Sequence, residues 1–343
     1  MPDNYMPSWL SYTLSATGLA SAAGGVMLYL YQSDLLYLPS HPDGSRTQVP
    51  KPSEFGMPYQ EEILTTKDNV KIRSYIIPQQ DEKAAMNAPT IIYFHANAGN
   101  MGHRLPISKV FWEKFKANVV MLSYRGYGLS EGTPNDKGLR IDSQTMLDHV
   151  RAHPVLGKTK IIAYGQSLGG AVAIDVVARN PDAFSGLMIE NTFLSVNKMI
   201  PHVIPMLKNL TWLCHLNWPS ESSIRQIVKT PILFLSGKKD ELVPPAHMRA
   251  LYETSQTRGL KVWKEFENGT HNDTCIQSGY FSAIRDFLLE IRDDMPEPAK
   301  EEAAATKEKT HLSEQDERFQ LVSGVADADG MTHSFRVEEV DED

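Results

Sequence analysis

Residues 158–180 read KTKIIAYGQSLGGAVAIDVVARN, and this stretch decides the fold. Residues 160–164 form a short apolar segment followed by a turn signal, which is typical of a buried strand. Residues 168–179 carry apolar side chains at helical spacing. A polar residue, Ser167, stands where the strand becomes the helix. The sequence therefore predicts a strand–turn–helix unit with a serine at its turn.

The turn, residues 165–169, fits the G-x-S-x-G pattern of a nucleophile elbow. In such an elbow the glycines permit a strained backbone and close helix packing, while the serine oxygen projects above the sheet. Because only three of the five positions are fixed, a plain turn fits the motif equally well. The strand before it and the helix after it favour the elbow.

Length and composition limit the classes of protein to consider. The chain has 343 residues, 41% of them hydrophobic, which suffices for one large domain with its own core. Its two cysteines, Cys214 and Cys275, match no zinc or redox motif. Residues 293–343 carry 16 acidic and 5 basic side chains, so residues 1–292 carry a net +3 of the total −8. We therefore expect no nucleic-acid partner, no metal and no cofactor.

Strand and helix patterns alternate through residues 60–292. Residues 61–66 and 71–77 predict a hairpin around Asp68 and Asn69. Helical stretches then separate short apolar segments that predict buried strands, at residues 90–94, 119–124, 160–164, 186–189, 232–235 and 261–266. This alternation predicts an α/β domain with a mostly parallel central sheet flanked by helices.

The chain begins with an apolar segment, since residues 4–33 contain no charged side chain. As a helix, residues 9–31 would reach roughly 33 Å at about 1.5 Å per residue, close to the thickness of a bilayer core. Aromatic residues lie near both of its ends, as in a membrane belt. We expect residues 1–38 to be an N-terminal membrane anchor with a transmembrane helix, and residues 39–59 a linker. A cleaved signal peptide and an interfacial helix are the alternatives.

The other end of the chain is acidic. Residues 293–343 are rich in proline, alanine and charged side chains and have few apolar anchors. Such a composition predicts a disordered tail, which is a candidate site for protein partners.

Ser167 needs two further groups to act as a nucleophile, because a hydroxyl is weak at neutral pH without a base and an acid that orients the base. Asp240 follows one predicted strand, and His271 follows the last one. Hydrolases with a nucleophile elbow use this chain order of serine, acid and histidine. Glu241 and Glu190 are alternative acids, and each of these residues also fits an ordinary structural role.

An oxyanion formed during acyl transfer needs donors already aimed at it. We expect the loop after residues 90–94 to direct backbone N–H groups toward the predicted elbow. We expect the N–H of Leu168, after the nucleophile, and the N–H of Asn97 to form the oxyanion hole. A plain turn with His95 packed as support is the alternative, and His95 is not assigned as a base.

Three further features invite interpretation. Residues 194–230 fit either a small lid that binds an acyl chain or an ordinary crossover helix. Residues 123–132 have three glycines but no P-loop lysine, so Arg125 is expected to brace neighbouring loops. His103 and Arg104 fit either contact with an anionic group or a structural ion pair.

The motifs together resemble one family. FHANAGNMGHRLP, LSYRGYGLSEG, YGQSLGGAVAID, IENTF, LFLSGKKDELVPP and NGTHNDT make the chain similar to the bud-emergence (Bem) type of α/β hydrolases over about residues 8–292. These are membrane-anchored serine hydrolases that are also similar to the animal α/β-hydrolase domain-containing protein thirteen. The resemblance implies the α/β-hydrolase fold, a triad of Ser167, Asp240 and His271, an N-terminal anchor, and ester or thioester hydrolysis, with relatives that remove palmitoyl groups from proteins. One residue departs from the pattern: Ala96 stands where relatives commonly have glycine, and a positive φ there would strain the oxyanion loop.

Three functional hypotheses follow. The first is a serine hydrolase that cleaves acyl esters or thioesters of lipids or acylated proteins near a membrane. The second is a membrane-tethered scaffold with a hydrolase fold, and the third is a serine peptidase. The resemblance favours the endoplasmic-reticulum membrane. The side of the catalytic domain stays open: the few basic residues near the apolar segment favour the cytosol by the positive-inside tendency, whereas sequons at Asn209, Asn268 and Asn272 permit lumenal glycosylation.

Overall fold

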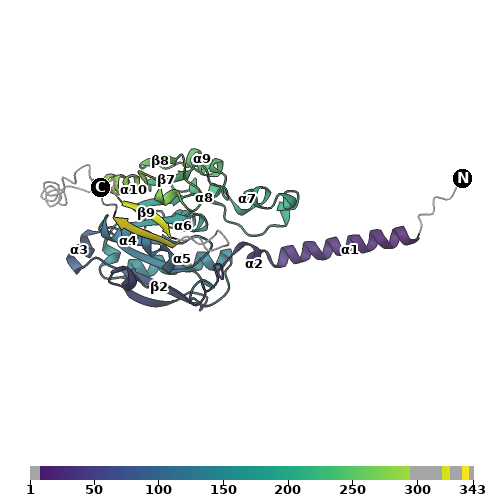
Figure 1. Cartoon of the computed structure of the whole chain (residues 1–343), viewed down its shortest axis with the longest axis horizontal. Coiled ribbons are helices and arrows are strands. Elements are labelled where there is room, and N and C mark those ends of the chain that lie inside the picture. Colours follow the sequence, from purple (N-terminus) through teal and green to yellow (C-terminus); the bar gives the residue numbers. More distant parts are fainter. Residues whose placement is uncertain (1–7, 294–318, 325–333, 340–343) are drawn as a thin grey trace.

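A computed structural model describes residues 8–293, 319–324 and 334–339. Its centre is an eight-stranded sheet in the order β1-β2-β4-β3-β5-β6-β7-β8 (Figure 1). The strands are β1 (Gln60–Thr65), β2 (Lys71–Ile77), β3 (Thr90–Phe94), β4 (Asn118–Ser123), β5 (Ile161–Gln166), β6 (Gly186–Glu190), β7 (Ile232–Gly237) and β8 (Lys261–Phe266). Only the β1–β2 and β2–β4 pairs of this sheet are antiparallel. The predicted α/β architecture with a mostly parallel sheet is confirmed.

Every predicted strand is present, and its ends lie within two residues of the predicted ones. The central strands β3, β4, β5, β6 and β7 are buried along their whole length. Such strands appear in a sequence as continuous apolar runs, because both faces of the sheet are covered by helices. This explains why short apolar segments were sufficient to locate them.

Helices cover both faces of the sheet. The α-helices are α1 (Ser8–Leu30), α2 (Gln32–Leu36), α3 (Glu82–Asn87), α4 (Leu105–Glu113), α5 (Asp136–Ala152), α6 (Leu168–Arg179), α7 (Val196–Val203), α8 (Ser220–Ile224), α9 (Pro245–Thr254) and α10 (Tyr280–Asp293). Short 3-10 helices are η1 (Pro52–Phe55), η2 (Met101–Arg104), η3 (Leu156–Lys158), η4 (Pro205–Leu207), η5 (Thr211–Leu213) and η6 (Thr274–Ile276). One apolar core packs α5, α6, α8 and α9 on the sheet, and a second packs α4 and α10 on its other face.

Helix α1 extends away from the body of the protein (Figure 1). The prediction of a transmembrane helix is corrected here: within the described residues, no helix combines the length and the apolar character needed to cross a membrane. The serine, threonine and glycine residues of α1 lower its hydropathy.

The segment expected to be a linker, residues 39–59, packs against the domain. Asn100 donates its side-chain N–H groups to the backbone carbonyls of Ser45 and Gln48, both at 2.9 Å. Met57 is buried in the same apolar core as α4. These contacts hold parts of the predicted linker on the domain.

Most of the predicted disordered tail lies outside the described residues. Two segments within it differ from the prediction: β9 (Phe319–Gly324) and β10 (Ser334–Glu339) pair as an antiparallel hairpin. Residues 334–338 alternate polar and apolar side chains, which is the pattern of a strand with two unlike faces, whereas residues 319–324 break this alternation at Leu321 and Val322. The average composition of the tail hid this local pattern.

Arg125 links two loops and a helix, as the sequence predicted. Its guanidinium donates to Asp142 on α5, with Nη2 2.8 Å from Oδ1, and to Asp68 in the β1–β2 turn, with Nη1 2.6 Å from Oδ2. The hydrogen bonds from Arg125 hold the pKa of Asp68 well below its usual range. The Asp142 side chain is fully buried. Through these two ion pairs, Arg125 connects the loop after β4 to the β1–β2 hairpin and to α5.

We predict that Arg125→Gln lowers the free energy of unfolding by about 3–5 kcal/mol, because it leaves a buried carboxylate without its cation. Burial already raises the pKa of Asp142 in the unchanged protein against the opposing effect of Arg125, so the loss of Arg125 raises this pKa further. The variant therefore loses more stability than the unchanged protein as pH rises from the unfolded pKa of Asp142 through its raised folded pKa. Denaturant unfolding of the full chain at several pH values measures both effects.

Arg73→Gln is the matched control, because Arg73 forms a half-exposed ion pair with Glu61 at 3.4 Å. We expect that loss to be about 0–1 kcal/mol. Equal losses in the two variants would contradict the account of Arg125.

Candidate active site

Ser167 lies at the sharp turn between β5 and α6, with φ 54° and ψ −119°. A positive φ is strained for any residue with a side chain. Close backbone packing surrounds the turn: a Cβ on Gly165 would lie 2.1 Å from the carbonyl oxygen of Gly169, and one on Gly169 would lie 2.0 Å from that of Phe94. Only glycine fits either position. The structure thus has the geometry that the sequence predicted for an elbow.

Asp240 and His271 lie in the loops after β7 and β8, and their side chains meet. The distance between His271 Nδ1 and Asp240 Oδ2 is 2.8 Å, and both side chains are buried. Because an ionised carboxylate only accepts hydrogen bonds, Nδ1 carries the proton and Nε2 is left free to accept one. The other carboxylate oxygen, Oδ1, accepts the backbone N–H groups of Leu242 at 2.9 Å and Val243 at 2.8 Å. These bonds fix the carboxylate and, through it, the plane of the imidazole.

The two alternative acids have other contacts. Glu241 accepts the backbone N–H of His271 on Oε2 at 3.2 Å, which holds the loop rather than the imidazole. Glu190 is completely buried and accepts the hydroxyls of Tyr164 at 2.6 Å and Tyr280 at 2.5 Å. Burial raises the pKa of Glu190. Of the three carboxylates, Asp240 is the one that is hydrogen-bonded to the imidazole.

The predicted oxyanion donors, Asn97 and Leu168, line the same cavity as Ser167 and His271. Apart from the hydrogen bonds within helices and strands, neither backbone N–H group donates to a backbone carbonyl of the described residues. Ala96 is not among the described non-glycine residues with positive φ, so its methyl group causes no backbone strain of that kind. The departure noted in the sequence is therefore accommodated.

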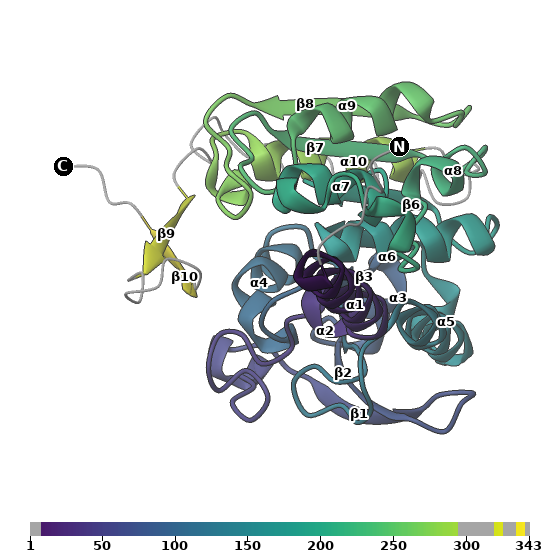
Figure 2. The same cartoon turned by 90° about the vertical axis from the view of Figure 1, so that its right-hand side faces the viewer.

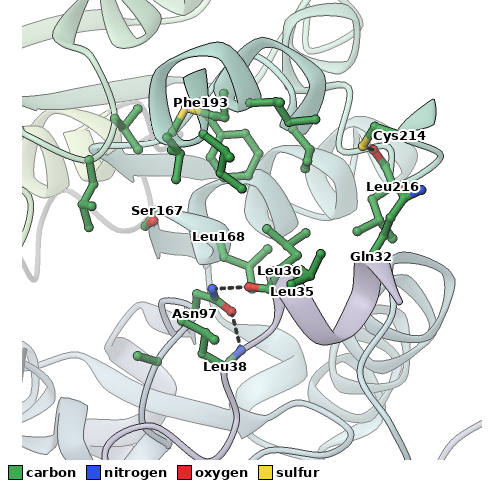
Figure 3. A pocket seen from close by; sticks show the side chains of 18 of the residues that line it. Gln32, Leu35, Leu36, Leu38, Asn97, Ser167, Leu168, Phe193, Cys214 and Leu216 are labelled. Atoms are coloured by element: carbon green, nitrogen blue, oxygen red, sulfur yellow. Dashed lines mark hydrogen bonds between the residues drawn. The ribbon is translucent and has the colours of Figure 1, made fainter. Parts of the chain in front are cut away.

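The side chain of Asn97 has a role that sequence reasoning missed. Its Nδ2 donates to the carbonyl of Leu36 at 2.6 Å, and its Oδ1 accepts the N–H of Leu38 at 3.2 Å (Figure 3). The Tyr127 hydroxyl also donates to Oδ1, at 2.7 Å. The Asn97 side chain thus holds the end of α2 and the residues that follow it against the loop that carries a predicted oxyanion donor. No local pattern signals a contact between residues 59 positions apart.

An apolar cavity of about 430 Å³ opens beside Ser167. In the view along α1 (Figure 2), α2 and α7 lie near the end of α1 that joins the body of the protein. The cavity walls come from the end of α1, from α2 and from residues 196–216, with Leu28, Leu35, Met199, Ile200, Leu207 and Leu213 among the apolar side chains. This volume is typical of a small-molecule site. Residues 194–230 therefore have two structural roles: they connect β6 to β7, and part of them forms a wall of the cavity.

The neighbouring histidines are unsuited to proton transfer. Burial lowers the pKa of His95 to about 3, and its Nδ1 lies 2.7 Å from the carbonyl oxygen of Ala96. Burial also lowers the pKa of His103 to about 4, and its Nδ1 accepts the N–H of Asn100. Their lowered pKa values favour neutral imidazoles, and both contact the backbone of the loop that carries Asn97. Within the described segments, no group of three or more His, Cys, Asp or Glu residues could hold a metal ion.

Comparison with known proteins agrees with this fold. Residues 110–227 match the serine aminopeptidase S33 family. The chain is 47% identical to protein bem46 of Schizosaccharomyces pombe over 291 residues, which cover 83% of this chain and 96% of bem46. It is 43% identical to the uncharacterized membrane protein YNL320W of Saccharomyces cerevisiae, over 77% of this chain and 90% of that protein.

Among solved structures, an esterase of Pyrococcus furiosus, PF2001, has a TM-score of 0.58 at 19% identity, over 71% of this chain and 94% of the esterase. This similarity shows a shared fold, whereas the similarity to bem46 extends over nearly the whole relative. The chain therefore belongs to the Bem46 family of α/β hydrolases.

Proposed function

We propose that this protein is a serine hydrolase that cleaves acyl esters or thioesters through Ser167, His271 and Asp240. The observation that carries the proposal is the cavity beside Ser167, which His271 and Asn97 also line. Its walls are mostly apolar, which suits an acyl chain next to a nucleophile. The hydrogen bond of 2.8 Å from His271 to Asp240 supports the assignment of base and acid.

The reaction follows from these roles in two halves. His271 Nε2 takes the proton of the Ser167 hydroxyl while Oγ attacks the acyl carbonyl. The backbone N–H groups of Leu168 and Asn97 hold the negative oxygen of the tetrahedral intermediate. His271 then protonates the leaving alcohol or thiol, and an acyl-enzyme remains. Water, deprotonated by His271, attacks the acyl-enzyme and releases the acid.

Asp240 acts on the imidazole rather than on the substrate. Its carboxylate keeps the proton on Nδ1 and stabilises the imidazolium that forms when Nε2 accepts a proton. Two backbone N–H groups bind its other oxygen, so the carboxylate is already oriented before the substrate arrives. Such preorganisation lowers the cost of forming the charged transition state.

Peptidase activity has less support, although the matching family is described as serine aminopeptidase. An aminopeptidase must bind a positively charged amino terminus, which calls for a nearby carboxylate. Among the described residues that line the cavity there is no Asp or Glu. The scaffold hypothesis rested on strain at Ala96 and on the acidic tail. Ala96 has no positive φ, so the first reason is removed. The tail lies largely outside the described residues.

Association with a membrane surface is part of the proposal. Large apolar side chains are exposed on α1, including Leu19 and Leu30, and near the cavity Met206 and Trp212 are 90% and 75% exposed. The name of the yeast relative YNL320W as a membrane protein gives further support. Such exposed apolar groups suit contact with lipid, from which an acyl substrate can reach the cavity. We keep the endoplasmic-reticulum membrane as the predicted location, and lipids or palmitoylated proteins as the substrate class.

We predict that a fluorophosphonate probe labels the protein and that Ser167→Ala abolishes the labelling, because the nucleophile is removed. Ester hydrolysis by this variant falls at least about 10³-fold in kcat. Ser222→Ala, which changes an exposed serine on α8, is the control and keeps full labelling. Undiminished labelling of folded Ser167→Ala would sink the assignment.

A second prediction separates the two neighbouring acids. Asp240→Asn lowers kcat for ester hydrolysis by about 10⁴-fold, because an amide favours the wrong tautomer of His271. Glu241→Gln changes only a bond to the backbone N–H of His271 and is expected to lower kcat far less. Steady-state kinetics with a short-chain p-nitrophenyl ester compares them. Equal losses in the two variants would argue against Asp240 as the acid.

A further inference from the structure

Arg104, at the end of η2, lines the cavity beside Ser167. Among the described residues that line this cavity, it is the one with a permanent charge. The apolar walls do not account for a guanidinium at this place. The sequence left two interpretations open, contact with an anion and a structural ion pair.

The contacts of Arg104 argue against the structural ion pair. Within the described part of the chain, no carboxylate lies within 4.0 Å of its guanidinium nitrogens. Nη2 donates to the carbonyl of Ala98 at 3.2 Å, and the buried Nε has no hydrogen-bond partner. A guanidinium has five N–H donors, so most of its capacity is unused. A buried donor without an acceptor is costly, which is a reason to expect a ligand there.

A second unpartnered nitrogen lies in the same cavity. His41 lines it, and its buried Nε2 has no hydrogen-bond partner in the described structure. The backbone carbonyl of His41 accepts the N–H of Gly99 at 2.7 Å, while Arg104 binds the carbonyl of the preceding residue, Ala98. The backbone of His41 and the side chain of Arg104 are therefore both hydrogen-bonded to the loop that follows Asn97.

The other residues that line the cavity indicate which part of a substrate Arg104 would contact. The apolar walls from α2 and residues 196–216 suit the acyl chain, whereas Arg104, His41, His271 and Asn272 are polar members of the lining. Because the apolar walls suit the acyl chain and His271 lines the same cavity as Arg104, the alcohol or thiol part that His271 protonates is the part of the substrate left for Arg104 to contact.

We propose that Arg104, assisted by His41, binds a carboxylate or phosphate on the leaving-group side of the substrate. This inference rests on the proposed acyl ester or thioester hydrolysis and narrows its substrate class to anionic esters. The planar fork of arginine matches two oxygens of such a group, and the apolar surroundings strengthen the interaction. An anion placed there also holds the scissile carbonyl in one orientation over Ser167.

Two matched pairs of esters test the proposal. Octanoylglycerol 3-phosphate is compared with octanoylglycerol, and octanoyloxyacetate with octanoyloxyacetamide. We expect the anionic member of at least one pair to have a kcat/KM about 10- to 100-fold higher, as for a charge-assisted hydrogen bond. Preference in the first pair alone identifies phosphate, and in the second alone a carboxylate; either supports the proposal.

The decisive quantity is the ratio of anionic to neutral kcat/KM in each variant. Arg104→Gln is expected to reduce the ratio to near one and Arg104→Lys to retain part of it, since lysine keeps the charge but not the fork. Lys109→Gln, on α4, is the control and keeps the ratio of the unchanged protein. No preference in the unchanged protein, or an equal fall for both members of each pair in Arg104→Gln, would overturn the proposal.

A binding measurement does not depend on catalysis. Octyl phosphate and octanoyloxyacetate are titrated calorimetrically into the full chain carrying Ser167→Ala, with and without Arg104→Gln. We expect Kd for at least one ligand to rise by about tenfold or more when Arg104 is replaced. Unchanged Kd values for both would refute the anion site. Binding that depends on Arg104, in a protein that hydrolyses no ester, would refute the proposed hydrolysis and keep the site.

Discussion

The close crossing of α6 over the end of β3 is the constraint on which the site depends. A Cβ on Gly169 would lie 2.0 Å from the carbonyl oxygen of Phe94, so only glycine allows this approach. The crossing positions Ser167, at the start of α6, beside the loop that continues β3 to Asn97. The predicted nucleophile and a predicted oxyanion donor are therefore set by one backbone contact. The positive φ of Ser167 is maintained because the sheet and α6 pack tightly on both sides of it.

The N-terminal segment is joined to this centre through Asn97. The side chain of Asn97 binds the backbone of Leu36 and Leu38, while its own N–H is a predicted donor to the oxyanion. Gln32 on α2 also donates to the carbonyl of Leu213 at 2.7 Å, in the segment that forms the opposite cavity wall. A change in how α1 and α2 lie would thus reach both the apolar cavity beside Ser167 and the loop that carries Asn97.

Sequence predicted those parts of the structure that depend on local pattern. Parallel strands could be located from short apolar runs, and the elbow pattern expects its acid and base in loops after later strands, so Ser167, Asp240 and His271 could be predicted together as a candidate triad. Contacts between distant segments could not be predicted, because nothing near Asn97 indicates that Leu36 and Leu38 lie against its side chain. The unused donors of Arg104 were equally invisible, since a sequence does not say whether a carboxylate will lie near a given arginine. At α1 the prediction of a membrane span was wrong, because the absence of charge, the length and the aromatic ends did not reflect how far its serine, threonine and glycine residues lower its hydropathy.

The most direct measurement is the identification of the acyl-enzyme. The protein is mixed with an octanoyl ester, quenched in acid within the first turnover, digested, and analysed by mass spectrometry. The account predicts an octanoyl group on Ser167, which forms during hydrolysis and disappears when substrate is exhausted. Hydrolysis without any acyl group on Ser167, or with the acyl group on a different residue, would contradict it.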